Sequence, residues 1–143
     1  MKFNSQICTT KEQSERLLAL ELKKETADCQ YAALVVDWKG NPISNPKWRF
    51  YDHNKGFIVQ NFERMERIPA WSLHRLIEMM PYDFTINNNT YELGITCDGA
   101  GYDDSEDGYP IVGWWRSNTY DDIIDCIEWL IKEGYFNKEY LEE

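Results

Sequence analysis

Apolar and polar side chains alternate along residues 82–97, on both sides of three consecutive asparagines at 87–89. The apolar members of this alternation are Phe84, Ile86, Tyr91, Leu93, Ile95 and Cys97. A period of two places such side chains on one face of a strand, and asparagine tolerates the left-handed backbone of a tight turn. The segment therefore predicts an antiparallel hairpin with one buried face and one face in water.

A short amphipathic helix is predicted just before this hairpin. Ser72 can cap it, because its hydroxyl accepts a hydrogen bond from a free N–H group of the first turn. Trp71 and Leu76 have the spacing of a hydrophobic staple, and Pro81 ends the helix. The expected buried face follows the i, i+3, i+4, i+7 pattern and consists of Leu73, Leu76, Ile77 and Met80.

An earlier helix is predicted to begin at Thr9 or Thr10, where Glu12 or Gln13 completes a capping box. Its broad apolar face contains Leu17, Leu18, Leu20 and Leu22. Lys23 and Lys24 suit the negative C-terminal end of a helix, so the helix is expected to end near residues 25–28.

The last helix has the clearest pattern, capped by Asn118 or Thr119 and stopped by Gly134. Asp121 and Asp122 lie at its positive end. Its apolar stripe is continuous and contains Tyr120, Ile123, Ile124, Ile127, Leu130 and Ile131. The residues that follow, 135–143, are expected to pack loosely.

Two further strands are expected, at residues 31–37 and at 110–116, the second being the third strand of a meander. Between the hairpin and that strand, residues 98–109 are predicted to be a loop, because Gly and Asp favour turns. Residues 43–67 show no sustained period, apart from a short strand expected at 57–60.

These elements predict a single α+β domain covering residues 1–143 of the 143-residue chain. The expected architecture is a small antiparallel meander of about three to five strands packed with about three helices on one face. No internal repeat or low-complexity tract divides the chain.

The charge balance of 15 Lys and Arg against 25 Asp and Glu gives a net charge of −10. A negative field of this size repels phosphate backbones, so direct binding of DNA or RNA is not expected. Solubility explains the charge without any ligand, whereas a basic protein partner or a bound cation would use it.

The four cysteines, Cys8, Cys29, Cys97 and Cys126, are scattered and form no C-x-x-C pair, so a zinc or redox site has no local support. The N-terminus lacks the apolar core of a signal peptide, and no apolar run reaches membrane-spanning length. These features predict a cytoplasmic protein with reduced cysteines.

Two segments carry a resemblance to a known family, residues 69–81 (Pro-Ala-Trp-Ser-Leu-His-Arg-Leu-Ile-Glu-Met-Met-Pro) and residues 123–136 (Ile-Ile-Asp-Cys-Ile-Glu-Trp-Leu-Ile-Lys-Glu-Gly-Tyr-Phe). They resemble short uncharacterised proteins of gut anaerobes, often carried on phages and mobile elements. The resemblance brings no known activity and no functional residue. It implies accessory cargo that works by binding a host or phage protein.

His74 with Ser72 and Glu78 is the candidate for acid–base chemistry. Glu78 shares a helix face with His74 at i+4, whereas Ser72 does not. A Ser–His–acid relay also needs an oxyanion site, and no Gly-x-Ser-x-Gly elbow is present. A capping role for Ser72 and a polar His74–Glu78 pair are the expected alternative.

The acidic segment 98–108 is the candidate cation site, because hard cations such as Ca²⁺ and Mg²⁺ take oxygen ligands. The candidate ligands are Asp98, Asp103, Asp104 and Asp107. The EF-hand pattern fails, since the twelfth position counted from Asp103 is Trp114. A solvated loop between strands is the alternative interpretation.

Trp114 and Trp115, with Tyr109 nearby in sequence, form the candidate partner-binding surface. Adjacent residues of a strand point to opposite faces, so one Trp is expected in the core and the other outside. An outside Trp is an anchor that protein interfaces use, and it also suits stacking on a sugar. Simple cover for a sheet face is the alternative.

The sequence thus predicts a non-enzymatic cytoplasmic accessory protein acting through contacts with an unidentified protein partner, for which a basic surface would fit. Mimicry of nucleic acid by ordered carboxylates is one version of this hypothesis. The alternative from another class is an enzyme or cation-binding protein, its site assembled from the 98–108 loop and a distant His53 or His74. The sequence indicates no oligomeric state and no membrane contact.

Overall fold

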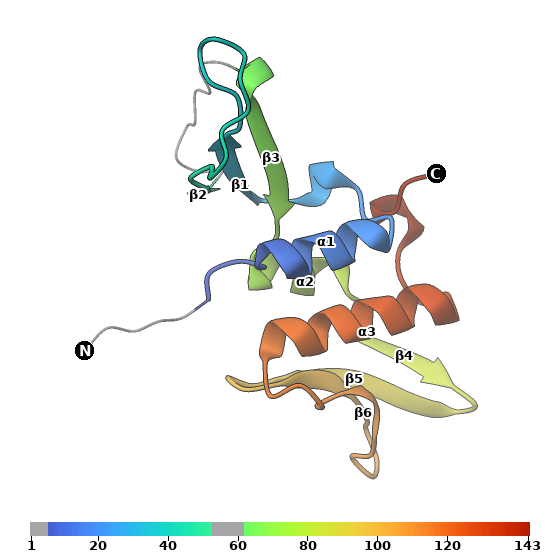
Figure 1. The fold of residues 1–143 in the computed structure, drawn as a ribbon. Helices are drawn as coiled ribbons and strands as arrows, with labels where there is room; N and C mark the ends of the chain where they lie inside the picture. The colour runs from blue at the N-terminus through green and yellow to red at the C-terminus, as the bar shows by residue number, and fades with distance from the viewer. Residues whose placement is uncertain (1–5, 53–61) are drawn as a thin grey trace.

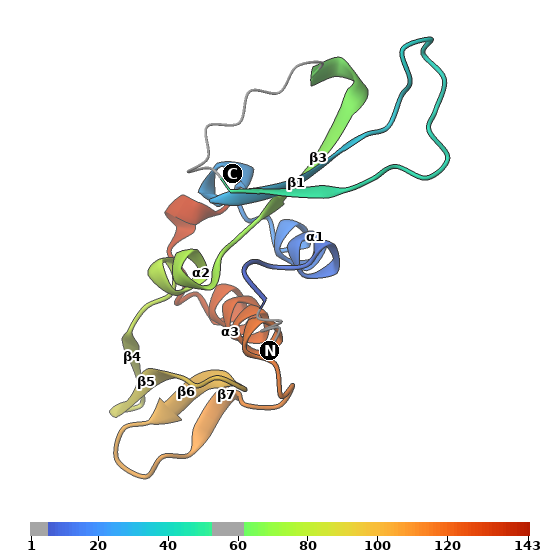
Figure 2. The ribbon, with the colours of Figure 1, turned by 90° about the vertical axis from the view of Figure 1, so that its left-hand side faces the viewer.

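Two antiparallel sheets lie on opposite sides of a layer of helices in the computed structural model, which describes residues 6–52 and 62–143 (Figure 1, Figure 2). One sheet has three strands in the order β2-β1-β3, and the other has four in the order β4-β5-β6-β7. This architecture confirms the α+β class. The sequence predicted one sheet, whereas the described residues form two.

The four-stranded sheet is a meander in which every neighbouring pair is antiparallel. Its strands are β4 (Asp83–Ile86), β5 (Asn89–Ile95), β6 (Ala100–Asp104) and β7 (Pro110–Gly113). Asn87 and Asn88 form the turn between β4 and β5 with φ angles of 49° and 70°. The predicted hairpin is therefore confirmed, and its turn uses the left-handed backbone that asparagine tolerates.

β6 lies inside the segment predicted to be a loop, so that part of the loop prediction is wrong. Gly and Asp are depleted in strands, and the sequence Ala-Gly-Tyr-Asp-Asp contains no β-branched residue. Burial of Ala100 and Tyr102, both 0% exposed, stabilises the strand instead. As a result β7 is the fourth strand of the meander, and it ends at Gly113 instead of continuing to Arg116.

The three-stranded sheet consists of β1 (Cys29–Leu34), β2 (Arg49–Asp52) and β3 (Met65–Ala70), all antiparallel. The predicted strand at 31–37 corresponds to β1, which starts earlier and ends at Leu34. β3 is an edge strand, which explains how it accommodates Pro69. The short strand expected at 57–60 lies outside the described residues.

The three α-helices of the described residues are α1 (Lys11–Ala19), α2 (Leu73–Met79) and α3 (Thr119–Glu133). Each follows a side-chain cap named from the sequence, Thr10, Ser72 and Asn118. None of the helices in the described ranges combines the length and the apolar character needed to cross a bilayer.

α1 ends at Ala19, so the end predicted near residues 25–28 is wrong. Glu21 has a left-handed backbone with φ 65°, and the Leu22 N–H donates to the Leu17 carbonyl at 3.2 Å. These features turn the chain away from the helix axis. Leu17 and Leu22 are both buried, but only Leu17 lies on the helix. Leu22 reaches the core from the turn that follows α1.

α3 lies at the centre of the core, where Ile123, Ile124, Ile127 and Leu130 are fully buried. The helix packs against α1 on one side and against β6 and β7 on the other (Figure 2). We call the face of the four-stranded sheet that α3 covers the inner face, and the opposite one the outer face. In the described parts of the chain, no helix or strand covers the outer face (Figure 2).

The C-terminal segment is tied to the turn after α1, so the expectation of loose packing is wrong. Leu141 forms an isolated β-bridge with Leu22. The Glu142 N–H donates to the Glu21 carbonyl at 2.8 Å, and Phe136 is only 4% exposed. The segment closes the core beside α1, which local sequence patterns do not reveal.

Candidate functional site

The four-stranded sheet and its loops carry a large share of the negative charge of the chain. Between Asp83 and Gly113 the sequence contains seven Asp or Glu residues and no Lys or Arg. Residues 29–70, which contain the three-stranded sheet, have six Lys or Arg and four Asp or Glu. Because the two sheets lie on opposite sides of the helices, the charge is concentrated at one end of the molecule (Figure 2).

Three carboxylates stand opposite one another on the outer face. Asp83 of β4 pairs with Glu92 of β5, which pairs with Asp103 of β6. Side chains directly opposite each other have Cβ atoms about 4.5–5.5 Å apart, and like charges there destabilise a sheet. None of the three joins the ion pairs formed within residues 6–52 and 62–143. We call Asp83, Glu92 and Asp103 the carboxylate row.

Trp114 covers the outer face beside the carboxylate row. Gly113 and Trp114 have φ angles of 90° and 67°, so the chain leaves β7 and the indole folds back across the sheet. A Cβ atom at Gly101 would lie 2.3 Å from Cδ1 and Nε1, one at Gly94 2.9 Å from Cζ2, and one at Gly99 3.1 Å from Cε3. These contacts reach opposite edges of the indole, which therefore lies face-down on three glycines.

The Trp114 indole is fixed to the carboxylate row by a hydrogen bond. Its Nε1–H donates to Asp103 Oδ1 at 2.8 Å. The Trp114 ring is partly buried and lies outside the core, and Trp115 is exposed, so the expectation that one of the two Trp residues enters the core is wrong. The left-handed turn at Gly113 and Trp114 breaks the strand alternation on which that expectation depended.

Trp115 projects into solvent from a backbone that is held in place. Its side chain is 83% exposed. The N–H groups of Trp115 and Arg116 donate to Asp122 Oδ1 at 3.0 and 2.9 Å, and the Ala100 N–H donates to Oδ2 at 3.2 Å. Asp122 is 0% exposed, so one buried carboxylate joins α3, β6 and the turn after β7.

Sequence reasoning placed Asp122 only at the positive end of the last helix and missed its role as an anchor. The available signal was its position directly before Ile123, at the start of the apolar stripe. A carboxylate that enters a buried stripe must find donors, because burial of an unpaired charge is costly.

Tyr109 is also exposed, at 74%, and lies at the other end of β7 from Trp114 and Trp115. At about 3.3 Å per residue of extended chain, Tyr109 and Trp115 are separated by at most roughly 20 Å. The structure therefore distributes the three aromatic residues along the β7 edge of the sheet, and only Trp114 contacts the carboxylate row.

Three of the four candidate cation ligands accept local hydrogen bonds, while Asp103 accepts from the Trp114 indole. Asp104 Oδ1, on the inner face, accepts two backbone N–H groups of the following loop at 2.8 and 3.3 Å. Asp107 Oδ1 accepts from the Tyr109 N–H at 3.0 Å, and Asp98 Oδ1 accepts from the Thr96 hydroxyl at 2.8 Å. These bonds give the carboxylates the roles of turn and loop caps.

The structure does not gather Asp98, Asp103, Asp104 and Asp107 into one ligand set. Asp103 and Asp104 are consecutive in β6, so they point to opposite faces of the sheet. Within the described ranges, no group of three or more His, Cys, Asp or Glu side chains is placed to hold a metal ion.

His74 lies on an exposed helix face and pairs with Glu78, with 3.1 Å between Nε2 and Oε1. The Ser72 hydroxyl contacts the Asp28 carboxylate and accepts from the Arg75 N–H, so Ser72 is occupied in capping α2. The two side chains therefore form no relay. His53, the other histidine considered for a site, lies outside the described residues.

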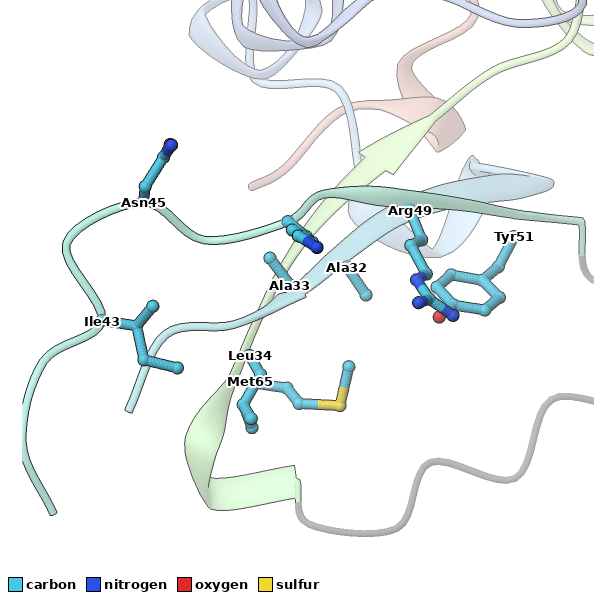
Figure 3. A pocket seen from close by; sticks show the side chains of 9 residues that line it. Ala32, Ala33, Leu34, Ile43, Asn45, Arg49, Tyr51 and Met65 are labelled. Atoms are coloured by element: carbon cyan, nitrogen blue, oxygen red, sulfur yellow. The ribbon is translucent and has the colours of Figure 1, made fainter. Parts of the chain in front are cut away.

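A groove of about 410 Å³ lies against the three-stranded sheet (Figure 3). Its apolar lining includes Leu34, Ile43 and Met65, while Lys47 and Arg49 contribute positive charge. The lining side chains of the described residues include no carboxylate, His or Cys, so they offer no acid–base pair.

Comparisons with protein-family models, with curated proteins and with solved structures find no match to this chain. The geometry and charge of the four-stranded sheet are therefore the features from which a function can be inferred.

Proposed function

We propose that this chain is a cytoplasmic accessory protein without enzymatic activity, which binds a basic protein through its four-stranded sheet. The binding surface consists of the carboxylate row, Trp114 and the exposed Trp115. The observation that carries the proposal is an 83% exposed Trp on a fixed backbone, at the end of a sheet whose charged residues between Asp83 and Gly113 are all acidic.

Trp115 supports a role in protein contacts because large exposed aromatic side chains are favourable anchors. Trp is among the residues that most often dominate interface energies when buried by a partner. The hydrogen bonds to Asp122 order the backbone of Trp115 and Arg116 before any partner binds. Such preorganisation lowers the entropic cost of association.

The charge of the sheet supports a basic partner. Complementary potentials accelerate the encounter of two proteins and disfavour partners of the same sign. An exposed acidic surface is screened by salt, with a Debye length of about 8 Å at physiological ionic strength. Binding through this surface should therefore weaken as the salt concentration rises.

The test is affinity capture from a lysate of the source organism, with bound proteins quantified at low and moderate salt. We expect a basic protein that the wild type retains and that Trp115→Ala loses. Trp38→Ala is the matched control, because Trp38 is 79% exposed and follows β1 in the other sheet. Equal capture by wild type and Trp115→Ala, or capture that salt does not weaken, would contradict the proposal.

A further inference from the structure

We infer that the outer face of the four-stranded sheet is a receptor for an arginine side chain of the partner. The receptor consists of the Trp114 indole and the neighbouring carboxylates Glu92 and Asp103. This inference rests on the proposed function, since it names the group that a basic partner would insert.

The Trp114 indole provides a flat, immobile platform. Its lower face rests on Gly94, Gly99 and Gly101, where an added Cβ would lie between 2.3 and 3.1 Å from ring atoms. The hydrogen bond from Nε1 to Asp103 prevents rotation within the plane. The glycines have no side chains to compete for the ring, so its upper face is the side that a ligand can reach.

A cation is the group that such a platform favours. The face of an indole carries negative electrostatic potential and attracts a guanidinium or an ammonium group stacked on it. Glu92 and Asp103 are directly opposite each other on the same face, and Asp103 touches the ring edge. A cation stacked on Trp114 would relieve the repulsion between these two carboxylates.

Arginine fits this arrangement better than lysine. Its planar guanidinium stacks on an aromatic ring and donates in its plane to carboxylates at the ring edge, whereas an ammonium is a strongly hydrated point charge. The seven carboxylates of residues 83–113, with no Lys or Arg among them, give the sheet and its loops the complementary sign. The occupant is therefore an arginine within a basic protein segment.

The test uses capped Gly-Arg-Gly-Arg-Gly peptide, titrated into the full chain labelled with ¹⁵N and followed by the indole N–H signals. Trp114→Phe identifies the Trp114 signal. We expect this signal and the amides of β5 and β6 to shift at low salt. The corresponding lysine peptide should bind more weakly, by about two- to fivefold, as expected for an exposed cation–π contact.

Charge-neutral variants locate the site without removing the platform. Asp103→Asn keeps an oxygen that can accept the Trp114 N–H, and Glu92→Gln keeps the side-chain length, so a native spectrum should persist. Each should weaken arginine-peptide binding about two- to fivefold. Glu106→Gln is the matched control, because it removes one charge from an exposed loop of the same sheet without touching the carboxylate row.

Equal losses of peptide affinity in Glu106→Gln and Asp103→Asn would overturn the inference, because the peptide would then respond only to the overall negative charge of the sheet. Shifts that avoid Trp114, or lysine binding as tight as arginine binding, would overturn it as well. Partner capture that needs Trp115 but is unchanged in Asp103→Asn and Glu92→Gln would keep the proposed function and reject the receptor. Peptide binding at Trp114 without any captured partner would support the arginine receptor and reject the proposed function.

Discussion

Asp122 offers the most direct test of how the site is held together. Its carboxylate is 0% exposed and accepts three backbone N–H groups, from Ala100, Trp115 and Arg116. Asp122→Ala removes all three acceptors and leaves the donors without partners. Each buried donor left unsatisfied costs about 1–3 kcal/mol, and donors that regain water cost less, so we expect a loss of about 3–5 kcal/mol.

Asp122→Asn should cost less, about 1.5–3 kcal/mol. The amide oxygen can still accept from the N–H groups of Trp115 and Arg116. The amide NH₂ then faces the Ala100 N–H, and because both groups are donors, that hydrogen bond is lost. The variant also loses the favourable interaction of a negative charge with the N-terminal end of α3. The expected order of stability is wild type, Asn variant, Ala variant.

The assay is urea unfolding followed by circular dichroism, which yields the midpoint and the slope m separately. With m of about 2 kcal/mol/M, the middle of the usual range in urea, the Ala variant should lower the midpoint by about 1.5–2.5 M without changing m. Asp121→Asn is the control, because it removes a charge from the same helical turn and keeps an oxygen for Gln13. An Asp122→Asn variant as stable as Asp121→Asn would refute the reasoning.

Four other outcomes are expected. Gly101→Ala should destabilise the sheet by about 2–3 kcal/mol and displace Trp114, visible in its fluorescence, since the new Cβ would lie 2.3 Å from the indole and 2.6 Å from the Val112 carbonyl. At pH 8 an alkylating reagent should modify exposed Cys97 while sparing Cys126, because burial raises the pKa of the Cys126 thiol to about 12; modification of Cys126 before unfolding would contradict this. Because the Cys126 pKa is raised in the folded state, the unfolded chain loses this proton at a lower pH. The free energy of unfolding should therefore be unaffected by Cys126 below its ordinary pKa of 9.0 and should fall as the pH rises from there towards 12. A free energy of unfolding that stays constant over that range would contradict this. Millimolar calcium should leave the melting temperature unchanged, because the carboxylates of the 98–108 loop accept local hydrogen bonds and do not converge; a calcium-dependent rise would contradict this.

The parts of the fold that could be predicted from sequence are those encoded by neighbouring residues. The Asn87–Asn88 turn needs only a left-handed backbone, and Thr10, Ser72 and Asn118 cap helices through bonds to residues three positions on. Such interactions leave a pattern within a window of a few residues. The sequence therefore predicted the turn and the Ser72 cap, and it narrowed the other two caps to Thr9 or Thr10 and to Asn118 or Thr119.

The parts that could not be predicted depend on contacts distant in sequence. β6 has no β-branched residue and contains Gly and Asp, and α3 packs against it where Ala100 and Tyr102 are buried. The C-terminal segment packs because Leu141 pairs with Leu22. Neither partner is visible in a local window.

The candidate site shows the same division. Tyr109 and Trp115 are exposed, but the position of Trp114 depends on two consecutive left-handed residues that end β7. The carboxylate row depends on the register of three strands, which no periodicity reveals. The sequence pattern therefore identified the candidate residues, whereas strand register and the turn after β7 determine which of them lie in contact.

The pairing of the first helix with the last has a consequence for synthesis on the ribosome. Gln13 donates to Asp121, 108 positions later, and Arg16 pairs with Asp125, 109 positions later. At about 5–20 residues per second, α1 emerges roughly 5–20 s before the helix that covers it. During that interval the core around Leu17 and Leu22 lacks α3, so the nascent chain offers chaperones apolar side chains that the finished protein conceals.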